Sequence, residues 1–400
     1  MFIATLLVAT QGIANNCECS YLGECESLDA SCTDITFVET SLESTLQSAC
    51  TNWVSFTAPH LAGDTLISKL FDGCTNLQSA SFNSFKGDIG YRAFYECTSL
   101  TSVGFPEMEG SIGDEAFSGT QLINALFPKM TGSIGALAFE GVATLVLANF
   151  AKMRGSIGNG AFKNTLLKTA NFNEMTGNIG VEAFGYTPLT TANFPKMTGN
   201  IGDEAFEFSS IQEAVFPLVT NDIGVSAFQF CNSLTKADFP EMTGSIKEAA
   251  FEHCLVLTNA SFPKMTGAIG DNAFKDCELL DTVDFGQSNE LGGKVFSGAG
   301  LKKLCMRHLK EVDQNALDDS QLTSIHMPHI SVPLFNILIS DICSEASACT
   351  NTEKEACGNV LQRAIDDDDD TGLIVGLSVG GAAIVVAGLI IWRCSGSRNA

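Results

Sequence analysis

One motif recurs about every 22 or 23 residues along most of this 400-residue chain. A clear copy reads Ile112-Gly-Asp-Glu-Ala-Phe117, followed by Leu122 and then by Phe127-Pro-Lys-Met-Thr-Gly-Ser-Ile134. The motif phenylalanine stands at Phe71, Phe94, Phe117, Phe139, Phe162, Phe184, Phe206, Phe228, Phe251, Phe274 and Phe296, and Leu317 takes its place at the end. Self-similarity at this period indicates a stacked array, not a closed globule around one active-site cleft. Such arrays present long surfaces to their surroundings.

Each turn of the array contains a short segment in which apolar and variable residues alternate. Leu234 to Phe239 is an example, and Leu100 to Phe105, Leu189 to Phe194 and Leu257 to Phe262 are equivalent. This alternation is typical of a half-buried strand, so stacked turns predict a parallel sheet along one face. A proline then ends the strand. A pair such as Thr198-Gly199 follows, and its glycine is expected to adopt backbone angles that other residues resist.

The residues that lead back to the next strand are too few for a long helix. We therefore expect short helical or irregular return segments, in which the isoleucine and the Ala-Phe pair point inward. The position three after the motif phenylalanine is always small. It holds Cys74, Cys97, Cys231, Cys254 and Cys277, and Thr, Ser, Val or Ala in the other turns. These cysteines are predicted to be buried packing residues, because Ser or Thr replaces them elsewhere.

The consensus Ile-Gly-x-x-Ala-Phe-x-x-Cys-x-x-Leu-x-x-Val-x-Phe-Pro is clearest at Ile223 to Pro240 and Ile246 to Pro263. It resembles the BspA-like leucine-rich repeats, which occur on surface proteins of bacteria and protists. The resemblance covers residues 66–328 and implies a curved leucine-rich repeat solenoid of about 12 turns. It also implies adhesion or recognition at the cell surface. Departures from the pattern predict local irregularity: Lys247 for the glycine, Ala151 and Asn173 for the proline, and a degenerate turn around residues 286–298.

The two ends of the chain indicate where the array is displayed. Residues 1–14 contain the apolar run from Phe2 to Ala9 and resemble a secretory signal peptide, although the usual positive charge is missing. Residues 371–392 carry no charge over about 22 positions, which is long enough for one transmembrane helix. Arginines follow this segment and place residues 393–400 in the cytoplasm as a short tail. The expected product is a single-pass type I plasma-membrane protein with an extracellular ectodomain.

A lipid anchor is the alternative for this end, but no polar spacer precedes the apolar run and a charged tail follows it. Gly372, Gly376 and Gly380 lie four residues apart, the spacing of close-packed membrane dimers, so a homodimer is one interpretation. The other interpretation is that glycine is simply common in membrane helices. Cys394 beside the inner leaflet is a candidate for lipidation.

Cysteines flank the repeat at both ends. The N-terminal cap, residues 15–65, and the C-terminal flank and acidic stalk, residues 329–370, lie outside the motif. A secreted setting favours disulfides among Cys17, Cys19, Cys25, Cys32, Cys50, Cys305, Cys343, Cys349 and Cys357. The five cysteines of the cap leave one over, for Cys74 or for another chain. Zinc at Cys17 and Cys19 is the weaker interpretation, because no second pair has suitable spacing.

No residue pattern points to catalysis or to a cofactor. The five histidines match no nucleophile or metal motif, and His326-x-x-His329 fits a surface or cap role better than a metal site. A net charge of −24 argues against nucleic acid, which proteins bind through Lys and Arg. The acidity suits solubility, with weak divalent-cation binding as the alternative. We therefore expect no enzyme activity, cofactor or metal.

The candidate binding surface is the outward side of the predicted strands. Its central part is a strip rich in Asn and Thr, and the proposed ligand residues are Asn124, Asn149, Thr169, Asn171, Thr191, Asn193, Lys236 and Asp238. Such a strip suits an extracellular protein or glycan, whereas the alternative is that Asn and Thr simply stack in a parallel ladder. Asn259 begins the one glycosylation sequon and lies on the same face.

The sequence thus predicts a non-enzymatic, membrane-integral surface protein whose ectodomain mediates adhesion or recognition of proteins or glycans. A structural coat protein that acts by self-association is one rival. The ligand-binding subunit of a receptor that signals through a partner is another, because the tail is too short for a signalling domain.

Overall fold

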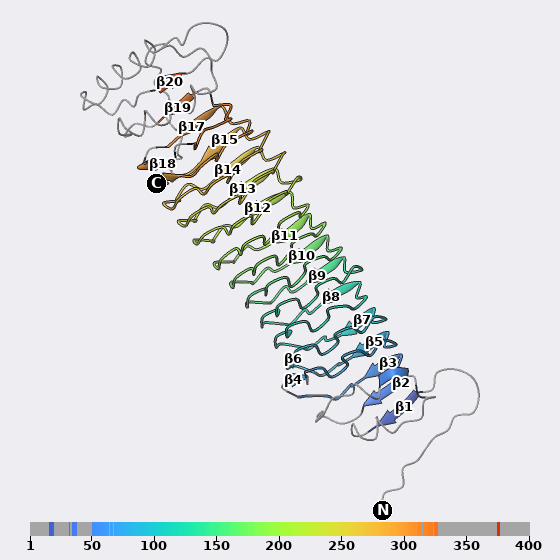
Figure 1. Cartoon of the computed structure of the whole chain (residues 1–400). Helices are drawn as coiled ribbons and strands as arrows, with labels where there is room; N and C mark the ends of the chain where they lie inside the picture. Colours follow the sequence, from blue (N-terminus) through green and yellow to red (C-terminus); the bar gives the residue numbers. More distant parts are fainter. Residues whose placement is uncertain are drawn as a thin grey trace, which may run out of the picture.

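The computed structural model describes residues 50–326 except 64, 67, 307, 314 and 323, together with 16–19, 32, 34–37 and 374–376. The chain is a parallel β-solenoid of about 11 turns, close to the 12 predicted. Figure 1 shows an elongated array in which short strands stack along one side and irregular segments return along the other. The predicted signal peptide lies outside the described residues.

The strands of the predicted face run in parallel from one turn to the next. They are β1 (Asn16–Cys19), β2 (Asp34–Phe37), β3 (Ser55–Thr57), β5 (Ser79–Ser81), β7 (Ser102–Gly104), β8 (Asn124–Leu126), β9 (Leu147–Asn149), β10 (Thr169–Asn171), β11 (Thr191–Asn193), β12 (Glu213–Val215), β13 (Lys236–Asp238), β14 (Asn259–Ser261), β15 (Thr282–Asp284), β17 (Lys303–Cys305) and β19 (Ser324–His326). Each predicted alternating segment therefore contains one three-residue strand at its centre.

Strand register follows from the small residue in the middle of each strand. Ala148 pairs with Ala170, and Ala170 pairs with Ala192, so the first and third residues of every strand point outward. The strands β1, β2 and β3 join β5 and β7 in one parallel sheet, so this face begins within the predicted cap. Separate sheets hold β8 to β11 and β12 to β15.

A second parallel ladder runs along the other side of the solenoid, and the sequence did not predict it. Isolated bridges join the motif isoleucines of neighbouring turns without a gap from Ile89 to Leu291. Short pairs extend this ladder at both ends: β4 (Thr65–Leu66) with β6 (Asp88–Ile89), and β16 (Glu290–Leu291) with β18 (Glu311–Val312). The isoleucine side chains are buried, as expected. This ladder remains continuous where the strand face is divided between β11 and β12.

The return segments consist of turns. Of the two predicted forms, short helical or irregular, they have the irregular one. In the described part of the chain, the one helical segment is the 3-10 turn η1 (Cys50–Asn52) in the cap. Each turn from Phe71 to Phe296 holds two residues in the left-handed region, one of them two positions before the motif phenylalanine and the other two positions after it. Glu182 and Tyr186 are one such pair, with φ of 53° and 57°.

The glycines of the Thr-Gly pairs have a different role from the one predicted. Gly199 and Gly244 do not have left-handed backbones, so the expectation of unusual angles is wrong. A Cβ on Gly199 would lie 2.4 Å from the carbonyl oxygen of Gly177 in the preceding turn. Glycine is needed because neighbouring backbones approach too closely for a side chain.

Two columns of phenylalanine fill the interior. Phe162 stacks between Phe139 and Phe184, with ring centroids 5.2 and 5.3 Å away. Phe150 and Phe172 belong to the second column and meet Phe162 edge-on at 6.1 and 6.2 Å. All five rings are fully buried. Stacked and edge-on rings at these distances are favourable arrangements of aromatic side chains, so each turn supports its neighbours.

The cysteine column is buried as predicted, and the structure shows why Thr and Ser replace cysteine there. The thiols of Cys97, Cys231, Cys254 and Cys277 are free and donate to phenylalanine carbonyls of the preceding turn, as Cys254 does to Phe228 at 3.1 Å. Thr120, Thr165 and Thr187 instead donate to the phenylalanine carbonyl of their own turn. Either way, the buried polar group is hydrogen-bonded.

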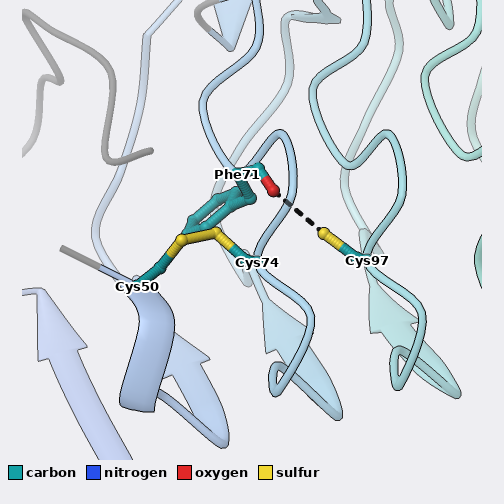
Figure 2. The surroundings of a disulfide bond; sticks show 4 residues. All are labelled: Cys50, Phe71, Cys74 and Cys97. Carbon is teal, nitrogen blue, oxygen red and sulfur yellow. Dashed lines mark hydrogen bonds between the residues drawn. A yellow bond between two sulfur atoms is a disulfide. The ribbon is translucent and has the colours of Figure 1, made fainter. Parts of the chain in front are cut away.

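Cys74 corrects the packing interpretation of this column, because it is disulfide-bonded to Cys50 (Figure 2). The five cysteines of the cap left one without a partner, and Cys74 was one of the two candidates for it. Cys17 pairs with Cys32, and Cys19 and Cys305 are also disulfide-bonded. Figure 2 shows the change along the column: Cys74 bonds to the cap, whereas Cys97 in the next turn is hydrogen-bonded to Phe71. Cys25, Cys343, Cys349 and Cys357 lie outside the described residues.

The free thiols are expected to be unreactive in the folded protein. Burial raises the pKa of Cys97 and of Cys231 to about 12, and it raises the pKa of Cys254 and Cys277 as well. Iodoacetamide at about pH 8 should leave these four cysteines unmodified in the native protein and alkylate them in denaturant, because the thiolate is the reactive form. Peptide mass spectrometry measures this, and rapid labelling of any one in the native state would contradict its burial.

The C-terminal end differs from the prediction in one place. Residues 374–376, within the expected membrane helix, form the strand β20 (Ile374–Gly376), antiparallel to β19. In the described part of the chain, β19 pairs with β17 on one side and with β20 on the other. Among the described residues, none belongs to a helix with the length and apolar character of a membrane span. The rest of 371–392, with Gly372 and Gly380, and Cys394 lie outside the described residues.

Candidate functional site

The strand face carries all eight predicted ligand residues at outward positions. They lie at the first or third place of β8, β9, β10, β11 and β13, and none of them is buried. The register places Thr169 beside Thr191, and Asn171 between Asn149 and Asn193. The structure therefore brings the Asn and Thr residues together in one strip, as the alternation predicts.

Stacking accounts for part of the asparagine strip. The side-chain amide of Asn171 donates to Oδ1 of Asn149 at 3.3 Å, which is one step of a ladder. Asn193 turns away and donates to Asn173 at 2.8 Å. Oδ1 of Asn171 is therefore buried without a hydrogen-bond partner among the described residues. Asn173, one of the departures from the proline pattern, thus interrupts the ladder.

The remaining predicted residues of this face have polar neighbours within the sheet. Lys236 and Asp238 pair with each other at 2.9 Å across β13, and such exposed ion pairs contribute little to stability. Asn259 is exposed on β14, and its amide donates to Thr282 at 2.9 Å. Its exposure is compatible with the predicted glycan, which remains a prediction.

A second surface lies on the return side, and the sequence analysis missed it. Tyr186, Phe208, Phe230 and His253 occupy the position two after the motif phenylalanine in four successive turns. Their rings stack with centroids 5.0, 4.5 and 4.6 Å apart and interplanar angles of 22°, 8° and 12°. We call these four residues the aromatic ladder. Tyr186 and Phe208 are 45% and 42% exposed, so the ladder forms part of the surface.

The backbone of the aromatic ladder is unusual for such large side chains. All four residues have φ between 53° and 57°, in the left-handed region. In the eight other turns the same position holds Gly73, Gly119, Gly141 and Gly298, Asn164, Asp276 and Asp319, and Glu96. A non-glycine residue in this conformation costs roughly 1–2 kcal/mol. Each stacked ring pair returns about 0.5–1.5 kcal/mol, so stacking offsets the backbone cost only in part. The signal in the sequence is the contrast between these large rings and the glycine, asparagine or aspartate at the same position in most other turns.

Carboxylates flank the aromatic ladder. Lys163 pairs with Glu182, and Lys275 pairs with Glu252 at 2.7 Å. Burial raises the pKa of the Glu204 carboxyl above its usual range, and nearby Glu182 adds to the effect. Burial likewise raises the pKa of Glu207, against a hydrogen bond with Tyr186 that lowers it. The surroundings of the ladder are therefore negatively charged and partly desolvated.

Three of these residues offer potential metal ligands. One atom each of Glu252, His253 and Asp276 lies within 4.8 Å of the others. Sequence spacing did not predict this cluster, because its members come from two turns. Both oxygens of Glu252 already accept hydrogen bonds, one from Lys275 and the other from Gln229 at 2.5 Å. The ring of His253 stacks on Phe230, so the cluster fits the ladder better than an ion site.

The comparison with known families identifies the repeat. The model of the BspA type leucine-rich repeat region matches in 6 copies, over residues 29–146, 110–234 and 221–336. The chain belongs to the BspA-type leucine-rich repeat family. The match begins before residue 66 and ends after 328, the bounds that the motif predicted. This earlier start agrees with the finding that β2 and β3 join the parallel sheet.

Several solved structures are similar to this BspA-type chain. A leucine-rich repeat protein from Bacteroides ovatus is 21% identical over 69% of this chain and 86% of that one, with a TM-score of 0.41. A leucine-rich cell surface protein from Faecalibacterium prausnitzii is 20% identical over 68% and 81%, with a TM-score of 0.32. A T. pallidum leucine-rich repeat protein is 18% identical over 57% and 78%, with a TM-score of 0.30. No curated protein matches the sequence.

Proposed function

We propose that this BspA-type chain is a non-enzymatic recognition protein of the cell surface, whose solenoid binds an extracellular protein or glycan. The signal peptide and the membrane segment predicted from the sequence support a single-pass type I arrangement. A homodimer through Gly372, Gly376 and Gly380 stays a prediction from the sequence, because the structure places Gly376 in β20 and not in a helix. Leucine-rich repeat proteins generally act through protein interactions, and the cell surface protein of Faecalibacterium prausnitzii has a similar repeat.

The observation that carries this proposal is the contrast between the two sides of each strand. The middle residues are almost all alanine or valine and point inward, whereas the outward residues change type and charge from turn to turn. Glu213 pairs in register with Lys236, which is followed by Asn259 in the next turn. A rigid scaffold with variable outward residues suits selective binding, because each turn presents a different contact at a fixed spacing.

A binding screen with the full-length protein in detergent tests the proposal. We expect saturable binding to at least one member of a panel of extracellular matrix proteins and glycans. Replacing Thr169 and Thr191 with tryptophan will reveal whether the strand face takes part in binding. Lys129→Trp is the matched control, because Lys129 lies off that face. Self-association without binding to any panel member would contradict recognition and favour the structural-coat alternative.

A further inference from the structure

Exposed aromatic side chains gather on one side of the solenoid. Among the described residues, the Phe, Tyr and Trp side chains that are not buried are Tyr91, Tyr95, Tyr186, Phe208 and Phe230. All five lie within three positions of a motif phenylalanine, in the return segments, and none lies on the strand face. Binding hot spots are rich in aromatic residues, so the return side has the composition that the strand face lacks.

The aromatic ladder presents the edges of its rings to solvent. Each inner ring is covered on both faces, because Phe208 lies between Tyr186 and Phe230, and Phe230 lies between Phe208 and His253. The ends are also occupied. Lys163 lies 5.8 Å over the ring of Tyr186, and Asp276 lies 3.5 Å from Nδ1 of His253.

Covered ring faces restrict what the ladder can bind. Sugars, nucleobases and quaternary ammonium groups stack on an open aromatic face, and the two inner rings of the ladder have none. Ring edges are apolar and carry a positive partial charge, so they pack against aliphatic side chains and against the faces of other aromatic rings. Such groups are supplied by a protein segment.

The charges around the ladder indicate the sign of that segment. Within the described residues, no lysine or arginine pairs with Glu204, Glu207 or Asp276 at ion-pair distance. The lysines of this region, Lys163 and Lys275, are already paired with glutamates. An excess of carboxylates beside an apolar ridge complements a partner that carries both basic and apolar side chains.

The fold does not require aromatic residues at these positions. Glycine, asparagine or aspartate takes the same place in seven other turns, where it suits the left-handed backbone better. Four consecutive turns nevertheless hold large rings there, and this stretch coincides with the carboxylates that have no Lys or Arg partner among the described residues. A binding role explains both features together.

We propose that the aromatic ladder is a docking site for a basic protein segment with apolar side chains. This inference rests on the proposed recognition function and assigns it to the return side. The partner's aliphatic or aromatic groups lie across the ring edges, while its Lys or Arg residues reach Glu204, Glu207 and Asp276.

Synthetic peptides of alternating Lys and Leu, of Lys and Gly, and of Glu and Leu probe the full-length protein in detergent by fluorescence anisotropy. We expect the Lys–Leu peptide to bind about tenfold or more tightly than either of the others. The double variant Phe208→Asn/Phe230→Asn should weaken Lys–Leu binding by about tenfold or more and leave the melting temperature nearly unchanged, because Asn164 already occupies this position. Phe208→Tyr/Phe230→Tyr should retain binding.

The double variant Leu218→Asn/Leu279→Asn is the matched control, because these leucines are 43% and 56% exposed and lie off the ladder. It should bind the Lys–Leu peptide like the native chain. Equal loss in this control, unchanged binding by the asparagine ladder variant, or equal binding of the Glu–Leu peptide would overturn the inference. If the ladder variant still binds a partner found in the screen, the ladder is not the docking site, but the recognition function stands. If the peptide binds through the ladder but the screen finds no partner, the ladder is supported and the proposed recognition function is contradicted.

Discussion

Replacing Phe162 with alanine is expected to lower the free energy of unfolding by about 3–5 kcal/mol. The ring is fully buried and stacks against Phe139 and Phe184, and it meets Phe150 and Phe172 edge-on. Alanine would leave a cavity between two turns that the strand face and the isoleucine ladder both hold at a fixed spacing. Because each turn of a solenoid contacts only its neighbours, the loss cannot be spread over a larger core.

Chemical denaturation of the full-length protein, followed by circular dichroism, measures this effect. Phe208→Ala is the control, since its ring is 42% exposed and its backbone is left-handed. We expect that control to lower the free energy of unfolding by about 1–3 kcal/mol, because it loses two ring stacks of about 0.5–1.5 kcal/mol each but leaves no buried cavity. Similar losses for Phe162 and Phe208 would contradict the division into a core column and a surface ladder.

Removing the disulfide between Cys50 and Cys74 should destabilise the N-terminal end of the solenoid by about 3 kcal/mol. The bond closes a segment with a sequence separation of 24 residues and joins η1 to the first turn that carries the motif. In Cys50→Ser/Cys74→Ser the cap is still held by the pairing of β3 with β5 and by the ring contact of Phe56 with Phe71. We therefore expect opening of β1 to β3 before the central turns.

Hydrogen exchange with mass spectrometry resolves this opening. In the double variant, amides of residues 50–63 should exchange faster, while those of residues 130–260 should remain as in the native chain. Cys254→Ser is the matched control, because its thiol is free and Ser209 fills the same place in another turn. Faster exchange throughout the solenoid, or no change in the cap, would show that the bond does not anchor this end.

The strand face was predictable because its period is short and regular. Alternation along Leu234 to Phe239 places Ala237 inside and Lys236 and Asp238 outside, and the structure agrees. The buried columns followed from residue size, and counting the cap cysteines left Cys74 or another chain as the partner of one of them. Each of these features depends on residues within one turn or on simple counting.

Features that depend on contact between turns were not predictable in the same way. The glycine of Thr198-Gly199 has an ordinary backbone and is fixed by its distance from Gly177. The isoleucine bridges need the register of neighbouring turns. At Lys247, where the motif glycine is missing, the hydrogen bond from the backbone N–H to Ile223 is 3.1 Å, close to the 3.0 Å from Gly224 to Ile201. This departure from the pattern therefore keeps the contact between turns.

The aromatic ladder was missed for a related reason. Its residues stand where other turns have glycine or asparagine, and aromatic residues give no local sign of a left-handed backbone. The four rings are also 22 or 23 residues apart in the sequence, so their stacking becomes visible only when turns are superimposed. Comparing the same position across turns would have separated Tyr186, Phe208, Phe230 and His253 from the rest.

Recognition by the solenoid surface is the central claim, and one binding series tests it most directly. The native full-length chain, the Phe208→Asn/Phe230→Asn variant and the Thr169→Trp/Thr191→Trp variant are compared on the same panel of matrix proteins and glycans. The account predicts saturable binding by the native chain and loss of that binding in one of the two variants. All three chains should melt at similar temperatures. Absence of binding by the native chain, or equal binding by all three, would contradict it.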